Sequence, residues 1–280
     1  MSDMLPNRDQ TELWNKGSGE AWVDMQALLD RLLEPFGRLV VDAGYPGEGG
    51  HVLDIGCGCG ATTLAMARRV GGSGHCVGLD ISHPLVSAAR KRAAAENVAN
   101  ASFVEGDAQV HALEQESYNA VISRFGVMFF DDPVAAFGNI HRSARPGAKL
   151  AFVAWRSPAE NEFMTTAVRA AAPLLPPMPA PNPDAPGQFA FADKSRVTSI
   201  LEASGWSKVE LQRAEVECQV SEDDLMTYVT KLGPVGNALR EADQPTAEKV
   251  TAVLRRAFAP FVDVGIARFT AACWLATARV

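Results

Sequence analysis

The sequence predicts an α/β fold built on an open, doubly wound and mostly parallel sheet. Short apolar stretches alternate with helical segments between residues 51 and 155, and this alternation is typical of consecutive βαβ units. A glycine-rich turn follows the first of these stretches, and acidic or small residues recur where the later ones end. Because the carboxyl ends of parallel strands share one edge of a sheet, we expect a ligand crevice at that edge.

The first 50 residues predict a helical lid that comes before the sheet. From Met25 to Phe36, apolar residues recur every three or four positions, which is the period of an amphipathic helix that covers one face of a sheet. Trp14 and Trp22 precede this helix and flank two glycines. We interpret that stretch as a flexible lead whose tryptophans close over the ligand, with simple packing of both rings on the core as the alternative.

The strand expected over 51–55 runs into a turn in which glycine alternates with cysteine. Glycine can adopt positive φ and leaves bare peptide edges that a nucleotide-like ligand can approach. The spacing Asp-x-Gly-x-Gly-x-Gly differs from the dinucleotide pattern G-x-G-x-x-G, and no lysine follows it as in a phosphate-binding loop. Asp54 would lie poorly beside a pyrophosphate but well beside an ammonium or a sulfonium. The turn therefore indicates S-adenosylmethionine (SAM) rather than NAD.

Acids and small residues also stand at the ends of the next three strands. Asp80 ends the second strand at about the distance along the chain that suits a ribose-binding carboxylate, so it should hold two hydroxyls. Asp107 and Ala108 follow the third strand, and Arg124 follows the fourth. We expect Arg124 to approach the methionine carboxylate of SAM, with a surface ion pair as the alternative.

The rest of the chain continues the alternation and then adds a helical insertion. Prolines crowd residues 172–187 and predict a long surface loop near the crevice. Apolar residues at helical spacing predict a helical cap over 221–265, and an apolar stretch over 266–280 predicts a final core strand. We therefore divide the chain into a lid over 1–50, a core over 51–220, the cap and the final strand. Within the core we expect helices over 84–95, 133–144 and 193–204 and strands over 76–82, 101–106, 118–122, 151–155 and 206–217.

Four motifs in this order resemble the core of class I SAM-dependent methyltransferases. The first motif and the ribose acid of that family are matched by 52–60 and 78–82, and its adenine contact is matched by 106–108. The turn before its fifth strand is matched by 145–150. The chain looks most similar to the branch that contains ubiquinone and menaquinone biosynthesis methyltransferases, which act on small molecules, although Ala148 stands where that branch usually has glycine.

This resemblance implies a Rossmann-like sheet of seven strands, in which the last strand is antiparallel and inserts beside the fifth. It also implies that the cap and the N-terminal helix form a roof over the substrate pocket. Ile81 would pack on adenine, Asp107 would accept a hydrogen bond from its amino group, and Ala108 would donate a backbone hydrogen bond to its ring. The full set of expected SAM contacts is Asp54, Gly56, Cys57, Gly58, Asp80, Ile81, Asp107, Ala108 and Arg124.

Methyl transfer from a sulfonium depends on alignment and exclusion of water, because the methyl group is already activated. His111 follows the third strand and is the candidate base for a phenol, with a surface loop histidine as the alternative. Aromatic and Met residues after the fourth strand and a tyrosine of the cap are candidates for the substrate pocket, with core packing as the alternative. With the two tryptophans, the expected pocket residues are Trp14, Trp22, Phe125, Met128, Phe129 and Tyr228.

The composition narrows the classes of partner. A net charge of -7 argues against a nucleic-acid substrate, since phosphate binding depends on clustered Lys and Arg. No apolar run reaches the roughly 20 residues of a membrane-spanning helix, and the N-terminus is polar, so we expect a cytoplasmic protein. Cys57 and Cys59 have no second pair or nearby histidines, which disfavours a metal site.

We therefore interpret the chain as a SAM-dependent methyltransferase that acts as a monomer or homodimer and releases S-adenosylhomocysteine (SAH). Its acceptor would be a small, largely apolar metabolite of the quinol, phenol, polyketide or terpenoid kind. A SAM-binding sensor or accessory protein without transferase activity is the alternative, and the glycine spacing disfavours an NAD-dependent reductase. The residues do not distinguish carbon, oxygen and nitrogen as the atom that receives the methyl group.

Overall fold

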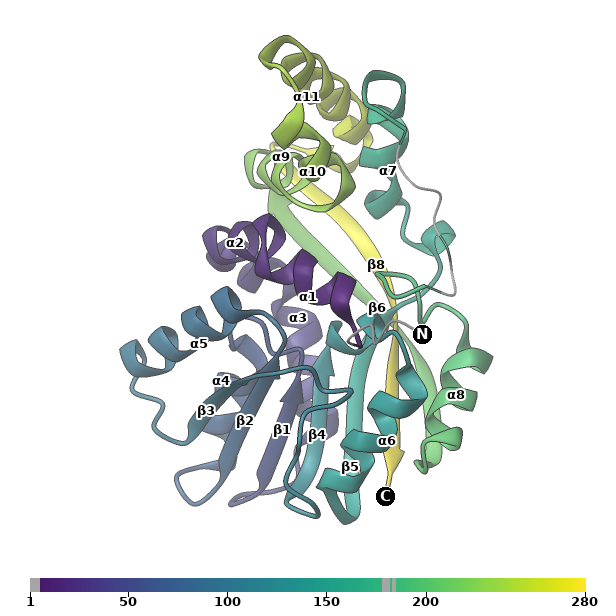
Figure 1. Cartoon of the computed structure of the whole chain (residues 1–280). Coiled ribbons are helices and arrows are strands. Elements are labelled where there is room, and N and C mark those ends of the chain that lie inside the picture. Colours follow the sequence, from purple (N-terminus) through teal and green to yellow (C-terminus); the bar gives the residue numbers. More distant parts are fainter. Residues whose placement is uncertain (1–5, 178–181, 183–184) are drawn as a thin grey trace.

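One mixed sheet organises the protein, whose computed structural model describes residues 6–177, 182 and 185–280. Figure 1 shows this sheet with helices around it and a helical layer above it. The strands are β1 (His51–Ile55), β2 (His75–Asp80), β3 (Ala101–Glu105), β4 (Tyr118–Arg124), β5 (Ala144–Trp155), β6 (Ser207–Ser221), β7 (Val262–Asp263) and β8 (Ile266–Arg279).

The strand order confirms the predicted fold class. The order is β3-β2-β1-β4-β5-β8-β6, with seven strands along this path and the two-residue β7 paired beside β8. Strands β1 to β5 run parallel, and β8 is antiparallel between β5 and β6, as expected. The order along the chain reverses between β1 and β4, so the crevice of this open sheet lies above the carboxyl ends of those two strands.

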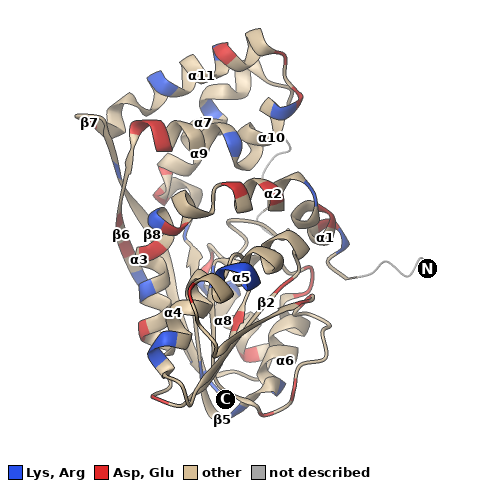
Figure 2. Ribbon diagram, turned by 90° about the vertical axis from the view of Figure 1, so that its left-hand side faces the viewer, with Lys and Arg blue, Asp and Glu red and all other residues tan. Residues whose placement is uncertain are grey.

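Helices cover both faces of the sheet (Figures 1 and 2). Two helices pack side by side on one face, two others pack together on the opposite face, and a fifth contacts β2 and β3. In Figure 2, Lys and Arg are interspersed with Asp and Glu along these helices. The first pair is α3 (Gln26–Gly44) with α4 (Ala61–Val70), the second is α6 (Pro133–Ser143) with α8 (Lys194–Ala203), and the fifth is α5 (His83–Ala95).

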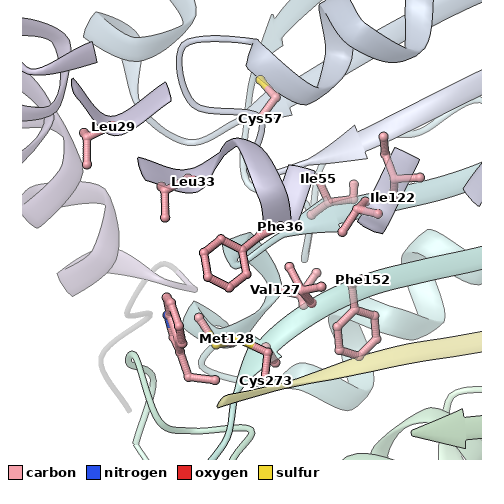
Figure 3. Packing of buried hydrophobic residues seen from close by; sticks show 14 of the residues in the cluster. Leu29, Leu33, Phe36, Ile55, Cys57, Ile122, Val127, Met128, Phe152 and Cys273 are labelled. Atoms are coloured by element: carbon pink, nitrogen blue, oxygen red, sulfur yellow. The ribbon is translucent and has the colours of Figure 1, made fainter. Parts of the chain in front are cut away.

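The predicted amphipathic helix is confirmed as α3, and its apolar face packs into the core (Figure 3). Phe36 is fully buried, and its ring meets those of Phe125 and Trp155 edge-on, with centroids 5.2 Å and 5.3 Å away. Strand β1 is buried along all but its first residue, as expected for a parallel strand covered on both faces. The core therefore extends to the carboxyl edge of the sheet, where Phe125 directly follows β4.

Two short helices precede α3 and correct the prediction of a flexible lead. They are α1 (Arg8–Asn15) and α2 (Gly17–Asp24), which we together call the strap. The ring of Trp14 contacts those of Trp22 and Phe129 edge-on, at centroid distances of 5.6 Å and 5.7 Å. Because these aromatic side chains pack on one another, the segment forms helices despite its glycines.

The insertion between β6 and β8 is helical, as expected. It consists of α9 (Glu222–Lys231), α10 (Gly233–Glu241) and α11 (Gln244–Phe258). A further helix that we did not anticipate, α7 (Glu162–Ala171), packs on α10 and α11, and we call these four helices the cap. The cap stands above the strap at the far end of the sheet (Figure 1). The division of the chain into functional units stays a prediction.

The proline-rich stretch 172–187 lies only partly within the described residues, because 178–181 and 183–184 fall outside them. Its first residues, Ala172–Leu174, form a 3-10 turn rather than a loop, since proline fits the start of such a turn. At its other end, Gly187 donates its N–H to the carbonyl oxygen of Met128, near the crevice. The other 3-10 turns are Gly126–Phe129, Pro158–Glu160 and Ala259–Phe261.

Candidate functional site

A cavity of about 440 Å³ lies over the carboxyl ends of β1, β2 and β4. The strap closes one side of it and helices α9 and α10 of the cap contribute the roof. Two kinds of residue share its wall, a polar set at the strand ends and an aromatic set between the strap and the cap. The predicted residues that line it are Gly56, Gly58, Asp80, Ile81, Asp107, Ala108, Arg124, Trp14, Trp22, Phe125, Met128, Phe129 and Tyr228.

The glycine turn after β1 brings bare backbone to the cavity. Gly56 has a φ of +66°, which favours glycine. A Cβ there would lie 2.6 Å from the Cα of Gly126, so the ends of β1 and β4 can come this close only because both residues are glycines. Gly58 has a φ of +54°, and no atom lies within 4 Å of the place where its Cβ would be. This turn therefore leaves an open cradle at Gly58.

Asp80 lies at the floor of the cavity and fixes the shape of the turn. One of its carboxylate oxygens accepts a hydrogen bond from the N–H of Gly58 at 2.8 Å, and the other accepts from the N–H of Ser82 at 2.9 Å. Burial raises the pKa of Asp80, while these two N–H donors act in the opposite direction. Each carboxylate oxygen keeps a second lone pair, so the side chain can still accept from two ligand hydroxyls.

Asp107 also lines the cavity and offers an unused acceptor. Its Oδ1 accepts hydrogen bonds from the Asn7 side chain at 2.7 Å and from the N–H of Gln109 at 2.9 Å. Its Oδ2 is buried and has no hydrogen-bond partner among the described residues. Since a buried acceptor without a partner is costly, a ligand N–H group fits at this atom.

Asn7 fastens the strap to the strand ends and is a residue that we missed. Its side chain is 2% exposed and donates to Asp107, as described above. Asn7 also exchanges two hydrogen bonds with Asp131, both 2.6 Å long. The second attachment is Asn15, which donates to the carbonyl of Ile81 at 3.0 Å and accepts from the N–H of His83 at 2.8 Å. These contacts hold the strap over the adjoining half of the cavity.

Asn7→Ala should therefore loosen the strap. The lost side-chain hydrogen bonds amount to about 1 to 3 kcal/mol, so trypsin should cleave after Lys16 about ten times faster than in the parent protein. Limited proteolysis followed by mass spectrometry measures this rate. Asn119→Ala, which removes a side-chain hydrogen bond to His51 in β1, should leave the rate unchanged, and equal rates for both variants would contradict the role of Asn7.

Asp54 is not among the residues that line the cavity, so its position does not favour the predicted contact with the sulfonium, which stays a prediction. Its side chain is fully buried, and its Oδ2 accepts hydrogen bonds of 2.6 Å from the hydroxyls of both Thr62 and Thr63. Those threonines stand in the first turn of α4. The hydrogen bonds of Oδ2 therefore fasten β1 to α4 beneath the glycine turn, while Oδ1 is buried and has no hydrogen-bond partner among the described residues.

The burial of Asp54 makes the stability of the fold depend on pH. Burial raises the pKa of Asp54 from 3.8 to about 6, against the lowering effect of the threonine hydroxyls. An acid whose pKa is raised by folding stabilises the protein below the unfolded pKa, and this contribution is lost as the pH rises through the folded pKa. The parent protein should lose about 3 kcal/mol from this group between about pH 4 and pH 7.

Asp54→Asn should remove this dependence, because asparagine does not titrate. Guanidinium unfolding of both proteins at pH 4.5 and pH 7.5 measures it. We expect the free energy of unfolding of the variant, relative to the parent protein, to be higher at pH 7.5 than at pH 4.5. A difference that is the same at both pH values would show that Asp54 does not carry the buried charge.

Two further predicted residues also lie outside the cavity wall. Cys57 is buried, a Cβ on Gly78 would lie 2.8 Å from its sulfur, and burial raises the pKa of its thiol well above the usual value. His111 packs its ring on the backbone of Gly106, where an added Cβ would lie 2.6 Å from Nδ1. Neither residue lines the cavity, so the positions do not favour a cofactor contact by the Cys57 side chain or a base at His111.

Arg124 brings a positive charge into the cavity wall. Its guanidinium makes no hydrogen bond or close ion pair with the described residues. Burial lowers the pKa of its guanidinium, while the negative charges of Asp30 and Asp54 act in the opposite direction. Its Nη1 lies 3.7 Å from the Cβ position of Gly37 in α3, so a small residue makes room for it. The unpaired guanidinium is suited to an anionic group of a ligand.

The aromatic half of the wall is built from packed rings. Phe125 stacks on Trp155 with centroids 4.1 Å apart and planes 3° from parallel, although its φ of 64° is unusual for a residue with a Cβ. Trp14 and Trp22 face this side from the strap, and Tyr228 faces it from the cap. These side chains therefore both pack on other rings and line the cavity, and their contact with a substrate stays a prediction. We did not predict Trp155 as a residue of the cavity wall, because in the sequence it only ends an apolar strand.

Comparisons with known proteins agree with this geometry. Residues 52–147 match the family described as "Methyltransferase domain". The chain is 32% identical over 147 residues to aklanonic acid methyltransferase DauC of Streptomyces sp. (strain C5). The aligned residues cover 51% of this chain and 67% of that protein. It is 31% identical over 171 residues to a demethylmenaquinone methyltransferase of Mycobacterium sp. (strain KMS). That alignment covers 58% of this chain and 70% of the relative.

Solved structures share the fold. The YcgJ protein of Bacillus subtilis superposes with a TM-score of 0.59 at 18% identity, over 88% of this chain and 98% of that one. Phosphoethanolamine N-methyltransferase 2 of Haemonchus contortus, solved with S-adenosyl-L-methionine, gives a TM-score of 0.58 at 14% identity, over 99% of this chain and 60% of that one.

Proposed function

The chain belongs to the class I SAM-dependent methyltransferases, which act on small molecules in the branch that it resembles, and we propose that its acceptor is a largely apolar metabolite. The acceptor would be of the quinol, phenol, polyketide or terpenoid kind. The observation that carries this proposal is the division of one cavity into a polar half at the strand ends and an aromatic half beneath the cap.

The polar half fits SAM through groups that the protein leaves unused. Gly58 leaves a cradle open for the ligand, and Asp80 has lone pairs free for the two ribose hydroxyls. The unpartnered Oδ2 of Asp107 would accept from the adenine amino group, between Ile81 and Ala108. Arg124 would hold the methionine carboxylate. When bound, SAM supplies a methyl group that a positively charged sulfur has already activated.

The aromatic half would hold and orient the acceptor. Rings from the strap, from the end of β4 and from β5 offer flat apolar surfaces that exclude water, and aromatic faces also tolerate a nearby cation such as a sulfonium. Among the described residues that line the cavity there is no histidine, and Asp80 and Asp107 would be engaged by the ribose and the adenine of SAM. The proposed reaction therefore depends on alignment of the acceptor rather than on a protein base.

The proposal also covers the functional units of the chain, its location and its partners. Residues 1–50 would serve as the lid of a SAM-binding core, and residues 221–265, which hold three of the four cap helices, as the insertion above it. We expect a cytoplasmic protein that is a monomer or homodimer. The net charge of -7 argues against a nucleic-acid partner. In the described part of the chain, no helix combines the length and apolarity that a membrane crossing requires.

Incubation with methyl-labelled SAM and a panel of quinols, phenols, polyketides and amines tests the proposal. We expect label in at least one apolar ring compound and accumulation of SAH. Tight SAH binding by calorimetry without transfer to any member of the panel would favour the SAM-binding sensor. Absence of SAH binding would overturn the assignment of the polar half.

A further inference from the structure

The roof of the cavity carries polar side chains that are all hydrogen-bond donors. Helices α9 and α10 contribute Tyr228, Lys231, Asn237 and Arg240 to the wall. The amide oxygen of Asn237 already accepts from the guanidinium of Arg240, which leaves its NH₂ group as a donor. No Asp or Glu of the cap lines the cavity among the described residues, and the acids in its wall, Asp80 and Asp107, stand at the strand ends.

None of these donors pairs with an acid among the described residues. The Tyr228 hydroxyl makes no hydrogen bond with the described residues, and burial raises the pKa of this phenol, so it stays protonated. Lys231 forms no ion pair within the described part of the chain, whereas Arg255 of the same cap pairs with Glu222. Arg240 bonds only to Asn237, and its guanidinium carbon lies 3.6 Å from the Cβ position of Gly17 in the strap.

The positions of these groups determine the electrostatic potential of the roof. Tyr228 and Lys231 are three residues apart in α9, and Asn237 and Arg240 are three apart in α10, so each pair shares one helix face. The cap helices stand over the strap helix α2 (Figures 1 and 2), where Arg240 reaches Gly17. Two cations that form no ion pair with the described residues stand above an apolar wall, and they attract an anion.

Resting on the proposed function, we infer that the acceptor carries an anionic oxygen group, a carboxylate or an acidic enol, which Tyr228, Lys231 and Arg240 bind. The apolar rings of the acceptor would then lie on the aromatic wall below, with the anionic group at the roof. This arrangement fixes the orientation of the acceptor by one charged end, and it selects acidic ring compounds over neutral ones of the same shape.

Calorimetry on the protein saturated with SAH tests the inference with matched probes. The carboxylate probe is 2-naphthoate and its neutral match is 2-naphthamide; the acidic enol is 2-hydroxy-1,4-naphthoquinone and its neutral match is 1,4-naphthoquinone. In the parent protein we expect at least one anion to bind about ten times more tightly than its neutral match. Comparison of this preference between the two pairs shows whether the carboxylate or the acidic enol is the better ligand. Raising the salt concentration should reduce the preference, because Lys231 and Arg240 are exposed.

Lys231→Met combined with Arg240→Met should remove the preference for the anion and leave the affinities for the neutral probes and for SAH within about twofold. Tyr228→Phe should weaken the anion by about fivefold through one lost hydrogen bond. The matched control, Lys249→Met with Arg256→Gln, removes two charges of α11 that do not line the cavity and should keep the preference.

Equal binding of anions and neutral matches by the parent protein would overturn the inference, as would a preference that survives in the double variant. If the parent protein did not bind SAH at all, the proposed function itself would fail, which is a separate outcome.

Discussion

Asp80→Ala should weaken the binding of SAH by about 100-fold or more, since hydrogen bonds to a charged group each contribute about 1.5 to 3 kcal/mol and the carboxylate would accept two from ribose. The substitution also leaves the N–H groups of Gly58 and Ser82 without their acceptor, so the glycine turn loses its shape. Isothermal titration with SAH measures the effect.

Two further variants separate ligand contact from loop structure. Asp80→Asn keeps an acceptor oxygen and the size of the side chain, and should lose about tenfold. Asp54→Asn alters the neighbouring buried acid, which lies away from the cavity, and should keep SAH affinity within about threefold. A variant at Asp54 that lost as much affinity as Asp80→Ala would support the sulfonium contact that the position of Asp54 does not favour.

The polar half of the site was largely predictable from the sequence, because it depends on where strands end. Asp80, Asp107 and Arg124 follow strands that share one edge, and parallel pairing brings them to one cavity. The surroundings of Asp54 were not predictable, because it stands inside its strand and the side to which a strand residue points follows from packing. Here the hydroxyls of α4 provide its partners, a contact that no spacing rule indicates.

The roof and the strap were less predictable, because their contacts join distant parts of the chain. Asn7 meets Asp107 and Asp131 across 100 and 124 residues, and nothing in a polar N-terminal stretch marks it as a contact. Helical spacing indicated that Tyr228 belongs to an amphipathic helix, but its orientation toward the cavity follows from how the cap sits on β6 and β8. Arg240 and Trp155 likewise gain their position from tertiary packing.

Arg124→Met should weaken SAH binding by about 30-fold, because an unpaired guanidinium and a carboxylate form a charge-assisted pair in a poorly solvated site. The same variant should bind 5′-methylthioadenosine as the parent protein does, since this ligand contains the adenosine and the sulfur but lacks the amino-acid part. Arg124→Lys keeps the charge but not the planar fork, so it should recover part of the SAH affinity that Arg124→Met loses. Its affinity for 5′-methylthioadenosine should equal that of the parent protein.

This pair of ligands distinguishes a contact at Arg124 from a general disturbance of the fold. Methionine removes a positive charge near Asp30 and Asp54 and lowers stability, but such an effect would weaken both ligands together. Asp80→Asn, which acts at the ribose, should weaken both ligands by a similar factor. If Arg124→Met also weakened both equally, the guanidinium would stabilise the buried acids beneath the glycine turn, and the methionine carboxylate would have to be held by another group.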